Sequence, residues 1–193
     1  MKRIIFLIYI CVFVFNWGKA WSLIEVDITR GNLNPLPLAV SPLSVDQNSK
    51  EKFKDLLKLD DIGAEISKVV ENNLRQSGLF NPLDPKAFLQ KPDIAHVKPR
   101  FEDWALIKAQ ALITGEVKIV DEKLRVEFRL WDILAGKEIM ALAFTTVSEN
   151  WRRVGHIITD KVYQRLTGEK GYFDTRIIYV AEEGLKTSRV KKL

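Results

Sequence analysis

Hydrophobic residues recur along this chain with two different periods, which predict strands in some segments and helices in others. Three runs, Ala111–Val120, Leu124–Ile133 and Glu138–Thr146, have strand character and are separated only by the short links "DEK" and "LAGK". Such short links predict antiparallel hairpins. A brief strand is expected at Leu38–Val40, between prolines, and another in "TRIIYVAEEG" (175–184).

Two segments show the spacing of three and four residues that is typical of an amphipathic helix. The first begins at Asp61, a suitable cap, and ends before Gly78; its apolar face consists of Ile62, Ile66, Val69, Val70 and Leu74. The second runs from Trp151 to Leu166, with Ser148 or Asn150 as its cap and Gly168 at its end. A short helix is expected over Phe101–Gln110, and Gln47–Asp60 is either a loop or a loosely docked helical turn.

Together these elements predict an α+β fold, with a mixed, mostly antiparallel sheet and helices packed on one face. The core is expected where the inner stripe of the long helix meets one face of the middle strand. That set is Trp151, Val154, Ile157, Ile158, Val162 and Leu166 from the helix, and Val126, Phe128 and Leu130 from the strand. Trp131 is expected on the opposite, polar face, where its ring would cover the stems of neighbouring arginines.

The dipeptide Trp131-Asp132 is one that marks each blade of a common β-propeller repeat. Here it occurs once, Gly155-His156 follows it instead of preceding it, and helical segments intervene. We therefore interpret it as part of an ordinary hairpin, an outward Asp beside a packed Trp.

The beginning of the chain resembles an export signal. Lys2-Arg3 precedes an unbroken apolar run from Ile4 to Phe15, which is shorter than the roughly 20 residues that a membrane-spanning helix needs. Small residues at Ala20 and Ser22 predict a signal peptide over residues 1–22, cleaved before Leu23 or directly after Ala20. An uncleaved anchor is the alternative. Cys11, the one cysteine, lies inside this run, so cleavage would leave no thiol.

Composition and charge are those of an ordinary globular protein and argue against nucleic-acid binding. The 193 residues are 47% hydrophobic and 28% charged, as in an ordinary globular protein. Loss of Lys2, Arg3 and Lys19 with the signal would leave 27 basic residues against 25 acidic ones, a formal charge of +2. The basic residues form no stripe with aromatic residues, so nucleic-acid binding is not expected.

Catalytic chemistry has little support in the sequence. His96 and His156 are isolated, no pair of residues has the spacing of metal ligands, and the phosphate-binding and nucleophile motifs are absent. His156 flanks the apolar stripe of the long helix and is expected to be a part-buried structural histidine. We therefore predict no enzyme, no cofactor and no metal site.

Several stretches resemble a known family. They are "DITRGNLNPLPLAV", "LRQSGLFNPLDPKAF", "FEDWALIKAQALITGEV", "RVEFRLWDILAGKEI" and, above all, "NWRRVGHIITDKVYQRLTGEKGYFDTRIIYVAE". They are similar to the amino-terminal domain of TolB, the periplasmic component of the Tol–Pal system, from the signal peptide to about Glu183. The resemblance implies an anticodon-binding-domain-like fold, a periplasmic location and no catalysis.

The resemblance also implies a division of the chain and a set of partners. Residues 1–22 would be the signal, 23–34 a mobile tail, 35–172 the α/β domain, and 173–193 the start of a propeller strand and a basic tail. In the family the mature tail binds the carboxy-terminal domain of TolA, an inner-membrane protein. The residues expected to do so here are Leu23, Ile24, Glu25, Val26, Asp27, Ile28, Thr29 and Arg30.

This tail has a second interpretation, because its Ile24, Val26 and Ile28 alternate with Glu25, Asp27 and Thr29 as in a half-buried strand. It could simply be the first strand of the domain. The family binds the lipoprotein Pal through a propeller that follows at about Leu193, so Pal binding is not expected from the printed residues alone. The segment "QNSKEKFKDLLKLDD" is longer and more charged than the family's usual link. A nucleic-acid or small-ligand binding module of anticodon-binding-like fold is the alternative function.

Overall fold

The computed structural model describes residues 34–91, 98–176, 180–183 and 190–192. The predicted signal peptide and the tail Leu23–Arg30 lie outside the described residues. The first part of the chain gives β1 (Leu36–Val40), β2 (Ser44–Val45), α2 (Gln47–Leu57), α3 (Ile62–Gln76), β3 (Phe80–Pro82) and the 3₁₀ turn η1 (Pro85–Ala87). The second gives α4 (Phe101–Leu106), β4 (Ala111–Val120), β5 (Lys123–Asp132), β6 (Lys137–Thr146), η3 (Ser148–Asn150), α5 (Trp151–Thr167), β7 (Ala181–Glu183) and β8 (Val190–Lys192).

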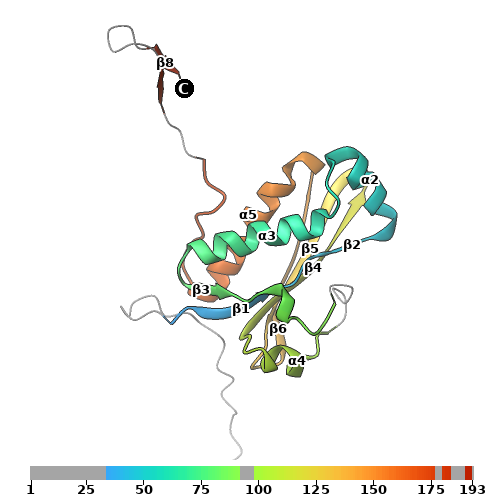
Figure 1. Ribbon diagram of the computed structural model, residues 1–193, viewed down its shortest axis with the longest axis vertical. Coiled ribbons are helices and arrows are strands. Elements are labelled where there is room, and N and C mark those ends of the chain that lie inside the picture. The colour runs from blue at the N-terminus through green and yellow to red at the C-terminus, as the bar shows by residue number, and fades with distance from the viewer. Residues whose placement is uncertain (1–33, 92–97, 177–179, 184–189, 193) are drawn as a thin grey trace, which may run out of the picture.

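One mixed sheet organises these elements (Figure 1). Its strand order is β3-β1-β4-β5-β6, and β2 also pairs with β4. Strands β3, β1, β2 and β4 pair in parallel, whereas β4, β5 and β6 form two successive antiparallel hairpins. The three longest strands are therefore antiparallel, and the predicted α+β fold with a mixed sheet is confirmed.

The turn between β4 and β5 explains how the first hairpin keeps its register. All ten residues of β4 pair with β5 in continuous register from Ala111↔Asp132 to Val120↔Lys123. The two turn residues, Asp121 (φ 49°) and Glu122 (φ 61°), both have left-handed backbone. A two-residue turn of this kind matches the twist of antiparallel strands, although glycine and asparagine adopt it more easily.

Helices α3 and α5 lie side by side on one face of the sheet (Figure 1). The Asp61 carboxylate accepts a hydrogen bond from the Ala64 N–H (2.9 Å), as the predicted cap should. Gly78 (φ 73°) and Gly168 (φ 78°) follow the two helices in left-handed conformation. Gly155 allows α3 and α5 to approach closely, because a Cβ there would lie 2.8 Å from Cγ1 of Val69.

The predicted core between α5 and β5 is confirmed. Val154, Ile158, Val162 and Leu166 are each at most 2% exposed and share one apolar cluster with Val126, Phe128 and Leu130. Trp151 is partly buried against that cluster, and Ile157 is half-buried. Asn150, one of the two residues predicted to cap α5, occupies its N-cap position, but its side chain makes no capping hydrogen bond; Ser148 belongs to the preceding η3 turn.

A second, smaller core lies on the opposite face of the sheet. Trp131 lies on that face as predicted, but its predicted surroundings were wrong, because it is buried in this core. Residues of α4 cover that face, so Trp131 is only 6% exposed and its Nε1–H donates to Thr114 Oγ1 (2.9 Å). The cluster consists of Ala39, Trp104, Ala109, Leu112, Trp131 and Ile133. The neighbouring Asp132 does not point outward as predicted: it is buried, and its Oδ1 accepts a hydrogen bond from the Ala135 N–H (2.8 Å) in the hairpin turn.

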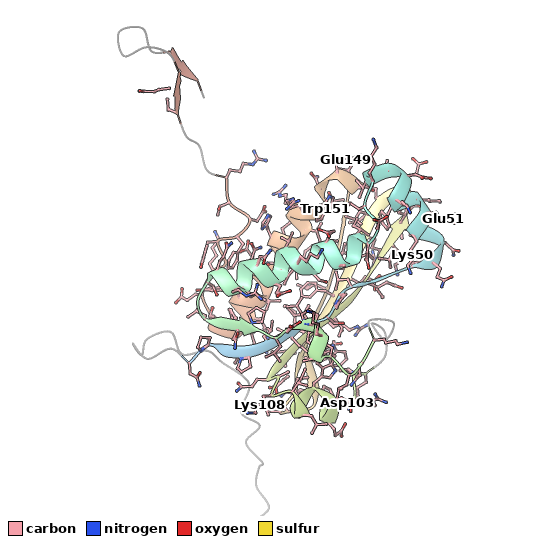
Figure 2. The ribbon with its side chains drawn as sticks, in the orientation of Figure 1. Lys50, Glu51, Asp103, Lys108, Glu149 and Trp151 are labelled. Carbon is pink, nitrogen blue, oxygen red and sulfur yellow. The ribbon has the colours of Figure 1, made fainter. Side chains whose placement is uncertain are left out.

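The segment Gln47–Asp60 is a helix and not a loop over most of its length. Phe53 of α2 is 1% exposed and joins the main core, and Ser49 Oγ accepts a hydrogen bond from the Ile119 N–H (2.9 Å). Lys50 and Glu51 are exposed on this helix (Figure 2). Glu149 and Trp151 lie at the same end of the molecule as α2, whereas Asp103 of α4 and Lys108, which follows α4, lie at the other end.

The last predicted strand, 175–184, is only partly described, because residues 177–179 lie outside the described residues. Within it, Ala181–Glu183 forms β7 and pairs antiparallel with β8. Among the described residues, no helix is long and apolar enough to cross a membrane.

Candidate partner-binding surfaces

The predicted tail site, Leu23–Arg30, cannot be placed, because it lies outside the described residues. The structure does show where the chain enters the sheet after it. The Leu36 N–H donates to the Leu79 carbonyl (2.9 Å), and β1 then runs between β3 and β4. Asn34 is exposed and Pro35 is half-buried, so Leu36 is the first buried residue of the part of the chain that the structure describes.

Strand β6 forms one edge of the sheet, and no described strand pairs with its outer side. It is ten residues long, whereas the strand at the other edge, β3, has three residues, one of them Pro82. Ala141, Leu142 and Ala143 at its centre are exposed, Leu142 by 37%. Sequence reasoning found this strand but not its edge position, because strand order is set by tertiary pairing.

The face of the sheet opposite α3 and α5 carries a ladder of alternating charges on β4, β5 and β6. The Lys118 ammonium lies 3.1 Å from Glu127 and 3.4 Å from Glu116, the Arg125 guanidinium lies 2.8 Å from Glu127, and Arg129 pairs with Glu138. The hydrogen bonds from Arg125 and Lys118 lower the pKa of Glu127. The hydrogen bond to Glu127 raises the pKa of Lys118. In this ladder the three cations Lys118, Arg125 and Arg129 are matched by the three carboxylates Glu116, Glu127 and Glu138.

A cluster of hydrogen bonds holds the chain that leaves α5. The Asp160 carboxylate accepts from the N–H groups of Phe173 (2.7 Å) and Asp174 (3.1 Å). Arg153 donates to both Asp174 oxygens, which raises the pKa of Arg153. Gly171 passes so close to Asp160 that a Cβ there would lie 2.4 Å from its Oδ1. This contact network explains part of the distinctive stretch "YQRLTGEKGYFDTR", which sequence analysis could quote but not interpret.

Among the described residues, no cluster of three or more His, Cys, Asp or Glu side chains is placed so that it could hold a metal ion. His156 is part-buried, and its Nδ1 lies 2.9 Å from Nδ2 of Asn73 on α3. Asn73 also donates to Thr159 Oγ1 (3.1 Å), so these polar groups join the two helices. The predicted structural histidine is confirmed.

These features define a small α+β domain with two long helices on one face of a mixed sheet, and with a long strand at an open sheet edge. A family model described as the TolB amino-terminal domain matches residues 24–139. The chain belongs to the TolB amino-terminal domain family.

Two relatives agree with this assignment. The chain is 75% identical over all 193 residues to the Tol-Pal system protein TolB of Pelagibacter ubique (strain HTCC1062), and it covers 42% of that protein. It therefore spans less than half the length of this relative. The crystal structure of TolB from Acinetobacter baumannii matches 82% of this chain and 35% of its own, with a TM-score of 0.59 and 22% identity. At this identity the match shows the fold.

Proposed function

We propose that this chain is a non-catalytic, periplasmic protein-interaction module of the Tol–Pal system. Its signal peptide is cleaved, residues 35–172 form the folded domain, and residues 23–34 form a tail that binds the carboxy-terminal domain of TolA. The module thereby links inner-membrane TolA to the outer-membrane Pal system, for envelope integrity and for constriction of the outer membrane at division. In the family, Pal is bound through a propeller, so Pal binding is not proposed for residues 1–193 themselves.

The family assignment and the relative named as a Tol-Pal system protein carry this proposal. The alternative, nucleic-acid or small-ligand binding, gains no support from these comparisons. On the open sheet face, the cations of the charge ladder are not available to a phosphate backbone, because Lys118, Arg125 and Arg129 are matched by Glu116, Glu127 and Glu138.

The tail suits a transient link made by strand addition to an open sheet edge of TolA. About six new backbone hydrogen bonds at ~1 kcal/mol each, with burial of Ile24, Val26 and Ile28, give perhaps 10 kcal/mol before costs. Ordering some eight residues opposes this with a cost of similar size. The expected affinity is therefore in the micromolar range.

Deletion of Leu23–Arg30 tests the proposal. A chain that begins at Gly31 should lose detectable binding to the TolA carboxy-terminal domain in isothermal titration calorimetry and keep the melting temperature of the chain that begins at Leu23. A second variant keeps the length of the tail and replaces Ile24, Val26 and Ile28 by serine. It should also lose binding, which would show that the apolar side chains and not the tail length are required. A melting temperature lower by several degrees would mean that the tail is the first strand of the domain. Undiminished binding would place the TolA site elsewhere.

Processing is a separate test of export. The intact mass of the exported protein should correspond to an amino terminus at Leu23 or Trp21. A membrane-retained species that begins at Met1 would contradict cleavage and leave the tail tethered.

A further inference from the structure

The chain that follows α5 turns back along that helix instead of leaving the domain at its end (Figure 1). Gly168 (φ 78°) ends α5 with a left-handed backbone. Farther along, the Asp174 N–H donates to Asp160 (3.1 Å), and the Asp174 carboxylate accepts hydrogen bonds from Arg153. Arg153 and Asp160 lie on one side of α5, two turns apart, because an α-helix has about 3.6 residues per turn. Residues 169–174, here called the strap, therefore run antiparallel to α5.

The Asp160 carboxylate holds the backbone of the strap with both of its oxygens. Oδ1 accepts a hydrogen bond from the Phe173 N–H (2.7 Å), and Oδ2 accepts the one from the Asp174 N–H. Hydrogen bonds of this kind are strengthened by the charge of the carboxylate. Gly171 permits the close approach, because a Cβ there would lie 2.4 Å from Oδ1 and 2.5 Å from Cα of Asp160. The contact thus requires a carboxylate on α5 and a glycine in the strap.

Aromatic rings add a second attachment beside Asp160. The Phe173 ring packs against the main core, with its centroid 5.8 Å from that of Tyr163 on α5. Tyr172 stacks on Phe173 (4.5 Å between centroids) but is 51% exposed. The strap lies on the side of α5 that faces away from the sheet, whereas Ile158 and the other core residues of α5 face the sheet. Release of the strap therefore leaves most of the main core covered.

The polar contacts of the strap differ in strength. The Arg153 side chain is 57% exposed, so its ion pair with Asp174 should contribute little. Asp160 is half-buried, and its loss would leave two backbone N–H groups to be satisfied by water alone. Asp160 and not Arg153 should therefore decide whether the strap stays on the helix.

We infer that Asp160 and Gly171 form a lock that fixes the direction in which the chain leaves this domain. A segment that follows a domain reorients freely unless contacts hold it. With the lock closed, the residues after Asp174 leave from one point on α5. With the lock open, they pivot at Gly168. Asp160 is thus a positioning residue for everything that follows the strap. The lock does not involve the tail Leu23–Arg30, so its failure and the failure of the proposed TolA site can be distinguished.

Distances between spin labels test the lock in the chain that begins at Leu23, which contains no cysteine. The strap pair carries labels at Lys68→Cys on α3 and at Arg176→Cys after the strap. The helix pair carries them at Lys68→Cys and at Lys161→Cys on α5. All three positions are exposed. Both pairs should give narrow distance distributions in pulsed electron paramagnetic resonance. A broad distribution for the strap pair in this parent protein would overturn the inference.

Two variants should open the lock by different means. Asp160→Ala removes the carboxylate, and Gly171→Ala keeps it but places a methyl group against it. Each should broaden the distribution of the strap pair and leave that of the helix pair unchanged. Glu51→Ala, which removes an exposed carboxylate from α2, is the matched control and should change neither. An unchanged strap pair in either variant would overturn the inference. Broadening of both pairs would do so too, because Asp160 would then support the whole fold.

Hydrogen exchange ranks the contacts independently of the labels. The amides of Phe173 and Asp174 should exchange at least about ten-fold faster in Asp160→Ala than in the parent, because their acceptor is lost. Arg153→Gln should accelerate them much less. Equal acceleration by the two variants would assign the hold on the strap to the ion pair and would overturn the role of Asp160.

Discussion

The two faces of β5 differ in their side chains: one face is apolar and buried, and the other carries paired charges. Towards α5, Val126, Phe128 and Leu130 are at most 1% exposed. Towards the other face, Arg125, Glu127 and Arg129 remain about one-third exposed and form paired charges. Buried apolar side chains dominate stability, whereas exposed ion pairs add little. Stability should therefore be concentrated on the helix side, and the open face and the β6 edge should be free to change without unfolding the domain.

The largest expected effect breaks the helix side. Ile158→Ala should reduce the free energy of unfolding by about 2–5 kcal/mol, because Ile158 is 1% exposed in a packed core. Urea denaturation measures it, with the exposed Lys161→Ala as the control. A loss under about half a kilocalorie per mole would mean that α5 is peripheral.

A smaller effect is expected where α3 crosses α5. Gly155→Ala adds a methyl group 2.8 Å from Val69 Cγ1 and 2.9 Å from Val69 Cβ, so one helix must shift. Overpacking of this kind costs about 1–3 kcal/mol. The double variant Gly155→Ala/Val69→Ala should recover part of the loss in thermal unfolding. No recovery would locate the strain elsewhere.

The charge ladder should contribute less, and its contribution should depend on pH. The pKa of Glu127 is lowered by its hydrogen bonds with Arg125 and Lys118, so its contribution is present above the ordinary carboxyl pKa and is lost as pH falls through the lowered value. Glu127→Gln should cost under about 1 kcal/mol at pH 7, since the pair is partly exposed. The difference from the parent should shrink as pH falls below the ordinary carboxyl pKa and through the lowered pKa of Glu127, and it should also shrink in high salt. A difference independent of pH would exclude this electrostatic origin.

The smallest predicted change is a gain at the hairpin turn. Glu122 has a left-handed backbone (φ 61°), which costs an ordinary residue roughly 1–2 kcal/mol. Glycine removes this strain but loses more chain entropy, so Glu122→Gly should stabilise by about 0.5 kcal/mol. Glu122→Ala is the control and should give no gain. Destabilisation by glycine would mean that the Glu122 side chain makes a stabilising contact.

The sequence predicted the elements better than their surroundings. Hydrophobic periodicity and capping residues located α3, α5 and the three long strands within a few residues, because these signals depend only on the local sequence. The burial of Trp131 was missed because α4, which covers it, is brought there by tertiary packing. The sequence does not distinguish a loop from a helical turn over Gln47–Asp60, because Phe53, the one large buried residue of α2, stands among polar residues in the sequence. The edge position of β6 was not available from any local pattern.

The same division holds for the candidate sites. The tail Leu23–Arg30 was predicted as a site from alternation and family resemblance, both of which are properties of the sequence, and it stays a prediction. The lock depends on the chain turning back along α5, which brings Gly171 and the Asp174 N–H to Asp160. Gly171 gave no signal of this contact until its neighbour was known.

Native-state hydrogen exchange of the free chain tests the central comparison most directly. The slowest amides should lie in β4, β5 and α5, which pack on both sides of the main core and should open only with global unfolding. The β6 amides that do not bond to β5 should exchange many-fold faster, because nothing described covers them. Uniformly slow exchange along all of β6, equal to that of β5, would contradict an open edge and would place a covering segment over it.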